Sequence, residues 1–310
     1  MYPEAEQHTT ATGFSARLLI AADDIKLAHS VFALPFALLA MFMAAAHDNR
    51  LPAISEAVLI VLCMFFARTV AMSFNRWADA SLDAQNPRTA SRAIPSGRLS
   101  KQYMLGLTIM CSFAFIISCA GFWLINGNYW PVLLCPAVLV YLVFYSFTKR
   151  FTSLCHLFLG IALAISPLAT VLAVQPDYLR ALPPYLLAAL VICWVTGFDI
   201  IYALQDIDAD KQVGLFSMPV HIGMQPALWI SRTAHLLVIV ILLALKQCGS
   251  YFHIAFTLAA VAAAMLLVIQ HILICKSHAK HIHTAFFTTN SIISILISLG
   301  GILDLVLALT

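Results

Sequence analysis

Long apolar runs dominate this 310-residue chain and leave little sequence from which a water-facing surface could be built. Hydrophobic residues make up 62% of the chain and charged residues only 10%, whereas a soluble domain carries about 25% charged residues. A membrane-spanning helix needs about 20 predominantly apolar residues. Nine runs are long enough, at 26–46, 53–74, 103–125, 131–148, 154–174, 183–203, 226–247, 253–275 and 284–309. The sequence predicts an all-α, polytopic membrane bundle of nine transmembrane helices around a central cavity.

The apolar runs follow one another without a long polar linker, which predicts a single transmembrane domain over residues 26–310. Residues 1–25 are expected to form a cytoplasmic N-terminal segment. This segment lacks a basic start, a long apolar core and a clear cleavage site, so we expect no cleaved signal peptide. The eight cysteines form no C-x-x-C pair, and those within the runs are expected to be buried, reduced thiols.

The placement of lysine and arginine predicts how the chain is oriented. If the spans alternate across the membrane, twelve basic residues fall in the connections on one side and three in those on the other. The richer side is cytoplasmic by the positive-inside rule. The chain is then a multi-pass integral membrane protein, in the inner membrane if it is bacterial, with its N-terminus in the cytoplasm. Both acidic stretches described below fall on the cytoplasmic side.

Three isolated features have structural interpretations. Pro35 lies within the first apolar run and predicts a kink there. The histidines between residues 271 and 283 favour an interfacial polar loop over a metal site. Asp304, near the end of the last run, is expected only to reach the outer interface.

The first polar stretch, residues 74–100, reads FNRWADASLDAQNPRTASRAIPSGRLS and lies between two apolar runs. If it begins as a helix that continues out of the second run, the i, i+4, i+8 spacing of Asn75, Asp79 and Asp83 places these side chains on one face. Arg68 lies seven residues before Asn75. It therefore returns to nearly the same face, deeper in the membrane.

A second acidic stretch, residues 198–210, reads FDIIYALQDIDAD and ends another apolar run. Asp199, Asp206 and Asp210 are spaced i, i+7, i+11, so they share one face if the helix continues without a break. Asp208 points away from that face. A lesser role is therefore expected for Asp208.

Two rows of carboxylates at the ends of membrane spans require compensation. A carboxylate near the bilayer centre costs about 2.5–3.5 kcal/mol on insertion scales, and several acids on one face repel each other. Mg²⁺ takes oxygen ligands and usually binds one or two carboxylates together with substrate phosphates. We expect the two stretches to face each other across a metal-bound diphosphate. Arg68, Arg88, Arg92 and Lys149 could neutralise the remaining phosphate oxygens.

A structural interpretation of the same acids is also open. Asp206 and Asp208 could be solvated charges near a helix end. Asp79 and Asp83 could form surface ion pairs with Arg76 or Arg88.

The motifs resemble those of the UbiA superfamily of intramembrane aromatic prenyltransferases. NRWADASLD resembles its N-x-x-x-D-x-x-x-D motif, and NPRTASRAIPSGRLS is similar to the continuation R-T-x-x-R-x-x-P-S-G. YALQDIDADKQVGLFS resembles the second motif, which ends here at Gly214 and Ser217. Tyr145 and Lys149 match Y-x-x-x-K. The resemblance extends over about residues 26–225, and Arg76 departs from it where many relatives that prenylate 4-hydroxybenzoate have aspartate.

The resemblance implies a role for each matching residue. One Mg²⁺ would be bound by Asn75, Asp79 and Asp83, and a second by Asp206 and Asp210. The diphosphate would be bound by Arg68, Lys149, Arg88 and Arg92. The catalytic residues would be Tyr145, which lines the site of the allylic cation, Lys149, and Asp199, which acts on the acceptor phenol as base or orienter.

The implied activity is Mg²⁺-dependent transfer of a polyprenyl group from polyprenyl diphosphate to a small aromatic acid such as 4-hydroxybenzoate, in ubiquinone or menaquinone biosynthesis. Membrane lipid is an expected partner, and nucleic acid is not. One alternative is a 1,4-dihydroxy-6-naphthoate-type acceptor. Another is a different activity of the superfamily, namely haem, chlorophyll or ether-lipid prenylation. An ion-coupled transporter is the alternative of a different class, because acids within membrane spans also serve ion pathways.

Overall fold

The computed structural model describes residues 13–26, 32–276 and 282–310, and the regular elements in these ranges are all helices. Eight described helices are long and apolar enough to cross a membrane. They are α3 (Ile54–Asp83), α4 (Lys101–Asn126), α5 (Trp130–Thr148), α6 (Cys155–Val174), α7 (Pro183–Ala203), α10 (Met224–Cys248), α11 (Ile254–Lys276) and α12 (Ile282–Leu309). A ninth apolar helix, α2 (Leu34–His47), is shorter. The prediction of an all-α membrane bundle is confirmed.

The first predicted span differs most from the structure. Its described helix begins at Leu34, so Pro35 lies in the first turn of α2, where the missing backbone N–H costs no helical hydrogen bond. The predicted kink is therefore wrong. His271 lies within α11 instead of a loop, and its Nε2 is 2.9 Å from Nδ1 of His235. The rest of the expected polar loop includes residues 277–281, which lie outside the described residues.

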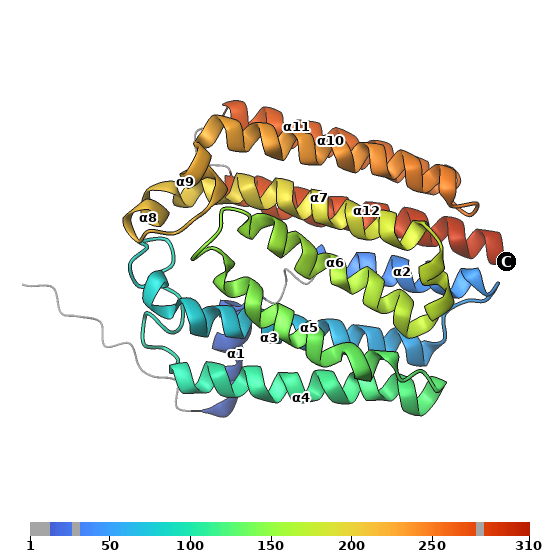
Figure 1. Ribbon diagram of the computed structural model, residues 1–310, viewed down its shortest axis with the longest axis horizontal. Coiled ribbons are helices and arrows are strands. Elements are labelled where there is room, and N and C mark those ends of the chain that lie inside the picture. The colour runs from blue at the N-terminus through green and yellow to red at the C-terminus, as the bar shows by residue number, and fades with distance from the viewer. Residues whose placement is uncertain (1–12, 27–31, 277–281) are drawn as a thin grey trace, which may run out of the picture.

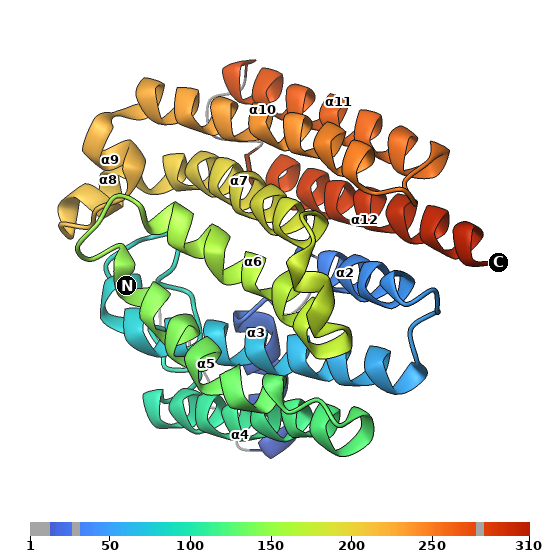
Figure 2. The ribbon, with the colours of Figure 1, turned by 45° about the vertical axis from the view of Figure 1, so that its right-hand side comes forward.

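The helices run side by side, with α7 near the centre of the bundle (Figures 1 and 2). Trp194 of α7 is fully buried and packs edge-on against Phe36 of α2, with ring centroids 5.4 Å apart. Its indole N–H donates to Asn290 of α12 over 3.0 Å. The connections that carry the two acidic stretches lie at one end of the bundle, and the C-terminus lies at the other (Figure 1). A site can form at the end of the bundle where the two acidic stretches lie.

The predicted N-terminal segment contains a short helix, α1 (Phe14–Asp24). Asp24 is buried, and its Oδ1 accepts the backbone N–H of Ala93 over 2.7 Å. Its Oδ2 lies 3.5 Å from Nε of Arg76 on α3. Ala21 and Ala93 are buried in one apolar cluster with Leu99 and Met104. The helix therefore fastens the loop after α3 to the body of the bundle.

Asp304 has a structural role that its place in the sequence did not reveal. It is buried on α12, so the expectation that it reaches the outer interface is wrong. Its carboxylate accepts the backbone N–H groups of His253, Ala255 and Phe256 over 2.7, 3.2 and 2.8 Å. These groups belong to the start of α11 and have no acceptor within their own helix. Asp304 thus caps α11 from a neighbouring helix.

The cysteines whose side chains the structure describes are free thiols. Cys111, Cys119 and Cys135 are buried, whereas Cys63, Cys155 and Cys193 are only partly buried.

Candidate functional site

A cavity of about 650 Å³ opens among the ends of α3, α5, α6 and α7, beneath the loop that follows α3. Every site residue predicted from the sequence lines it. These residues are Arg68, Asn75, Asp79, Asp83, Arg88, Arg92, Tyr145, Lys149, Asp199, Asp206 and Asp210. Asp208 is exposed and does not line the cavity. The fold therefore brings together side chains that come from five separate parts of the chain.

The acids of the first stretch lie on one face of α3, as their spacing predicts, because α3 continues unbroken to Asp83. Asp79 is 1% exposed, and its two oxygens lie 2.6 Å from Nζ of Lys149 and 3.2 Å from a guanidinium nitrogen of Arg150. Asp83 is also buried and accepts from Arg92 over 2.6 Å. The partners are Lys149, Arg150 and Arg92, and they are not the predicted Arg76 and Arg88. For Asp79 and Asp83, the interpretation as surface ion pairs with Arg76 or Arg88 is therefore wrong.

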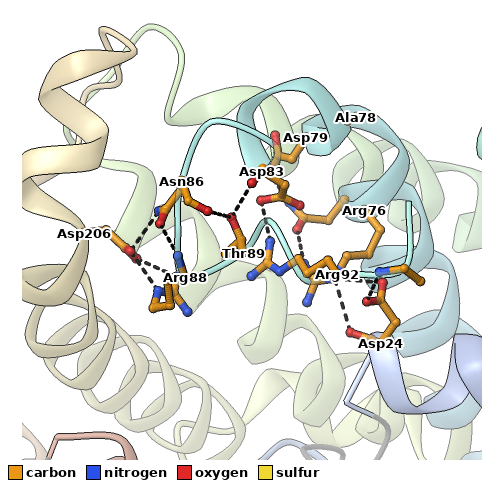
Figure 3. A network of polar contacts seen from close by, with 12 residues as sticks. Asp24, Arg76, Ala78, Asp79, Asp83, Asn86, Arg88, Thr89, Arg92 and Asp206 are labelled. Atoms are coloured by element: carbon orange, nitrogen blue, oxygen red, sulfur yellow. Dashed lines mark hydrogen bonds and ion pairs between the residues drawn. The ribbon is translucent and has the colours of Figure 1, made fainter. Parts of the chain in front are cut away.

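Arg88 joins the two acidic stretches (Figure 3). Its Nε and Nη2 donate to the two carboxylate oxygens of Asp206 over 2.8 and 2.6 Å, and its Nη1 donates to the hydroxyl of Tyr202 over 2.8 Å. Asn86 donates to Asp206 over 3.1 Å. Burial by itself lowers the pKa of Arg88, but the hydrogen bond to Asp206 and the nearby charges outweigh it and raise the pKa above its ordinary value. The contact therefore stays ionic.

The second acidic stretch is not one helix. The α-helix α7 ends at Ala203, a 3-10 turn spans Leu204–Asp206, and the short helix α8 covers Ile207–Gln212. The prediction of an unbroken helix is wrong. The tighter turn changes the direction of the chain, and yet both Asp206 and Asp210 still line the cavity. Leu215 to Met218 then return towards α5, where the Phe216 N–H donates to the Lys149 carbonyl over 2.8 Å.

Arg68 and Tyr145 lie where this polar cavity meets a second, apolar cavity of about 260 Å³. The apolar cavity is lined by side chains that include Ile60, Cys63, Met64, Phe115, Cys119 and Phe122. Arg68 Nη2 donates to the carbonyl of Lys26 over 3.3 Å, but its buried Nε has no hydrogen-bond partner among the described residues. A buried guanidinium with an unused donor favours an anion at this junction.

Asp199 lies on the opposite wall, on α7, and is partly exposed to the cavity. Its Oδ2 is 2.7 Å from Nδ1 of His156 on α6. His156 is buried and also lines the cavity, and its Nε2 lies 3.3 Å from the backbone nitrogen of Met218. The carboxylate is therefore held on one side and open to the cavity on the other.

The donor chemistry of the cavity fits a hard divalent cation. Its acids offer carboxylate oxygens, and the buried Oδ2 of Asp83 has no hydrogen-bond partner among the described residues. Within the part of the chain that the structure describes, no three acidic, histidine or cysteine side chains are gathered closely enough to hold an ion by themselves. This is compatible with Mg²⁺, which usually binds one or two carboxylates and completes its octahedron with water and substrate phosphate.

Sequence reasoning missed four residues that contact the predicted ones, namely Asp24, Asn86, Arg150 and His156. Arg150 follows Lys149 directly, and Asn86 follows Asp83 by three residues, so proximity to a motif was a usable signal. Asp24 and His156 carry no such signal. Each meets its partner only through packing between helices.

Known proteins match this chain along most of its length. The UbiA prenyltransferase family model matches residues 33–292. The 4-hydroxybenzoate octaprenyltransferase of Edwardsiella ictaluri is 30% identical over 257 residues, which cover 81% of this chain and 84% of that enzyme. The enzyme of the same name from Photobacterium profundum is 33% identical over 185 residues. This second match covers 59% of the chain and only 61% of that enzyme.

Solved structures show the same fold. A UbiA homologue from Aeropyrum pernix K1 superposes with a TM-score of 0.79 at 29% identity, covering 90% of this chain and 98% of the homologue. A homologue from Archaeoglobus fulgidus superposes with a TM-score of 0.67 at 17% identity, covering 93% and 99%. Sequence, fold and the motifs that line the cavity agree, and the chain belongs to the UbiA prenyltransferase family.

Proposed function

We propose that this protein transfers a polyprenyl group from a polyprenyl diphosphate to a small aromatic acid such as 4-hydroxybenzoate, in quinone biosynthesis. The observation that carries the proposal is the pair of adjoining cavities. One is lined by acids and bases and suits a diphosphate with its counterions. The other is apolar and suits an isoprenoid tail. Arg68 and Tyr145 line both cavities, at the junction where the reacting carbon would lie.

The diphosphate is held by basic side chains that already face the cavity. Lys149 and Arg92 each contact a carboxylate of α3, and Arg68 has a donor to spare. All three can donate to phosphate oxygens. Since the guanidinium nitrogens of Arg88 are engaged by Asp206 and Tyr202, we assign Arg88 the orientation of Asp206 in place of direct phosphate binding.

Asn75, Asp79 and Asp83 would hold one Mg²⁺, and Asp206 and Asp210 a second. Bound there, Mg²⁺ acts as a Lewis acid that stabilises negative charge on the departing diphosphate. The Archaeoglobus fulgidus homologue is described with GPP and Mg²⁺ bound. For this chain the ions are proposed from its own carboxylates, of which Asp79 and Asp83 are buried too deeply to be solvated surface charges.

The reaction is an electrophilic aromatic substitution. The allylic C–O bond breaks, its electron pair leaves with the diphosphate, and Lys149 and Arg68 stabilise the charge that develops there. The ring of Tyr145 can face the allylic cation. The ring carbon ortho to the acceptor hydroxyl then forms the new C–C bond, while Asp199 accepts the hydroxyl proton. The membrane-embedded apolar wall keeps water from the cation.

The acceptor and the location are proposed on different grounds. The names of the curated relatives favour 4-hydroxybenzoate over dihydroxynaphthoate and over haem, chlorophyll or ether-lipid substrates. Family membership favours prenyl transfer over ion-coupled transport. The excess of basic residues in the connections at the cavity end supports a cytoplasmic active site and a cytoplasmic N-terminus.

Membranes that contain the protein test this proposal when they are incubated with labelled polyprenyl diphosphate and a panel of aromatic acids, with products identified by mass. Asp79→Ala and Asp206→Ala should each lower prenyl transfer at least about 100-fold, because each removes a carboxylate proposed to hold the Mg²⁺ that offsets the charge of the diphosphate. The matched control is Asp208→Ala, since Asp208 is exposed and outside the cavity. Its activity should equal that of the wild type.

Chelation provides the second arm of the same test. EDTA should abolish transfer, and added Mg²⁺ should restore it. Full activity after thorough chelation, or in either cavity variant, contradicts the proposed site. Substrate flux in proteoliposomes without Mg²⁺-dependent diphosphate release would support the transporter instead.

A further inference from the structure

His156 is a buried polar residue to which neither the motifs nor the metal site assigns a role. It lies in the first turn of α6, 3% exposed, beside the carboxylate of Asp199 on α7. The distance between its Nδ1 and Oδ2 of Asp199 is 2.7 Å, and that between its Nε2 and the backbone nitrogen of Met218 is 3.3 Å. Both ring nitrogens are therefore used.

The second contact fixes where the imidazole carries its proton. A backbone N–H can only donate, so Nε2 of His156 must present its lone pair to Met218. The ring proton is then on Nδ1 and points at Asp199. His156 consequently donates to one carboxylate oxygen, Oδ2. Asp199 also lines the cavity, and its other oxygen, Oδ1, forms no hydrogen bond with the described residues.

The surrounding backbone holds this arrangement in place. One turn after His156, a Cβ at Gly160 would lie 2.8 Å from the carbonyl oxygen of Ile192 and 2.9 Å from Oγ1 of Thr196. A side chain there would force α6 and α7 apart, so glycine permits the close approach that brings His156 to Asp199. On the other side, the segment that contains Met218 is anchored by the hydrogen bond from Phe216 N–H to the Lys149 carbonyl.

We propose that His156 is a positioning residue for the acceptor half-reaction: it holds the Asp199 carboxylate so that its open oxygen accepts the proton of the acceptor's phenolic hydroxyl. This rests on the proposed function. The hydroxyl proton moves to Asp199 as the ring carbon attacks the allylic carbon, which gives a dienone. Loss of the hydrogen from that ring carbon and return of the proton from Asp199 to the oxygen restore the phenol. One proton is released with the diphosphate, so the step balances.

This role separates the two substrates. Within the part of the chain that the structure describes, His156 contacts Asp199 directly and forms no hydrogen bond with the basic residues proposed to bind diphosphate. Loss of its Nδ1–H should therefore disturb the aromatic acceptor and leave the prenyl diphosphate bound as before. A role in packing alone would disturb both substrates and the stability of the fold.

The test compares His156→Phe, which keeps the ring but removes both hydrogen bonds, with His156→Asn, whose amide N–H replaces Nδ1–H. His156→Phe should lower kcat about 10- to 100-fold and raise the KM for 4-hydroxybenzoate, with little change in the KM for polyprenyl diphosphate. His156→Asn should recover most of the lost rate. Asp199→Asn should be at least as slow as His156→Phe, because it removes the proton acceptor itself.

A fluorinated 4-hydroxybenzoate supplies a readout that packing does not affect. Its hydroxyl is more acidic and needs less help from a base, so the ratio of wild-type to His156→Phe rates should shrink at least about threefold. An unchanged ratio, or wild-type kinetics in His156→Phe, overturns the positioning role. If His156→Phe fails to insert into the membrane, His156→Asn provides the test. Slow transfer by His156→Asn that the fluorinated acceptor does not speed up also overturns the positioning role. Failure of the proposed function is distinguishable, since the wild type would then prenylate none of the aromatic acids.

Discussion

At the scale of single residues, the contact between Arg88 and Asp206 joins two motifs that are 118 positions apart. Arg88→Ala should lower prenyl transfer about 10- to 100-fold, because the hydrogen bonds of Arg88 orient Asp206, which is proposed to hold Mg²⁺. Arg88→Lys should restore little, since an ammonium cannot donate to both carboxylate oxygens and to Tyr202 in this geometry. The measurement is the rate of transfer as a function of Mg²⁺ concentration.

The control for Arg88 is Arg180→Ala, because Arg180 is an exposed arginine that pairs with Asp177 over 3.4 Å. It should behave as the wild type. A double-mutant cycle with Asp206→Asn then isolates the coupling between the two side chains. If the losses in the two single variants simply add in the double variant, the orienting contact between Arg88 and Asp206 is contradicted.

At the scale of elements, Asp304 shows how one helix is completed by another. Asp304→Ala leaves three N–H groups at the start of α11 without their acceptor, and it should lower the free energy of unfolding by about 1–2 kcal/mol. Thermal unfolding in detergent measures this. Activity per folded molecule should not change, because Asp304 lies outside the cavity. An unchanged melting temperature would contradict the capping role. The melting temperature of Asp304→Asn should lie between those of the wild type and Asp304→Ala.

At the scale of the whole molecule, the adjoining cavities separate the head of the substrate from its tail. Ala169 of α6 lines the apolar cavity six residues beyond Leu163, which lines both cavities, and six residues of helix span about 9 Å. Ala169→Phe should therefore shorten the space for the tail. The ratio of activity with geranyl diphosphate to that with longer polyprenyl diphosphates should rise about tenfold.

The control for this change is Ile161→Phe on the same helix, because Ile161 does not line the apolar cavity. It should leave the chain-length preference as in the wild type. If Ala169→Phe keeps the wild-type preference, the tail occupies a different path.

The apolar runs and the spacing of the motifs were enough to predict the fold class and many of the residues that line the polar cavity. Runs of apolar residues identify spans because each helix must satisfy its own backbone in lipid. The four-residue spacing of Asn75, Asp79 and Asp83 identifies one face because helical periodicity is a local property. Both arguments need only neighbours in the chain, and for this reason they held.

The partners that side chains meet across helices could not be predicted from local spacing, because they depend on the packing of the bundle. The 3-10 turn at Leu204–Asp206 ends the periodicity on which the second acidic face was predicted. The contacts of Arg88 with Asp206 and of His156 with Asp199 depend on how helices are rotated and how closely they pack. The spacing of residues along the chain gives no information on how helices are rotated or packed against one another. The sequence therefore identified the groups, and the packing of the bundle set their partners.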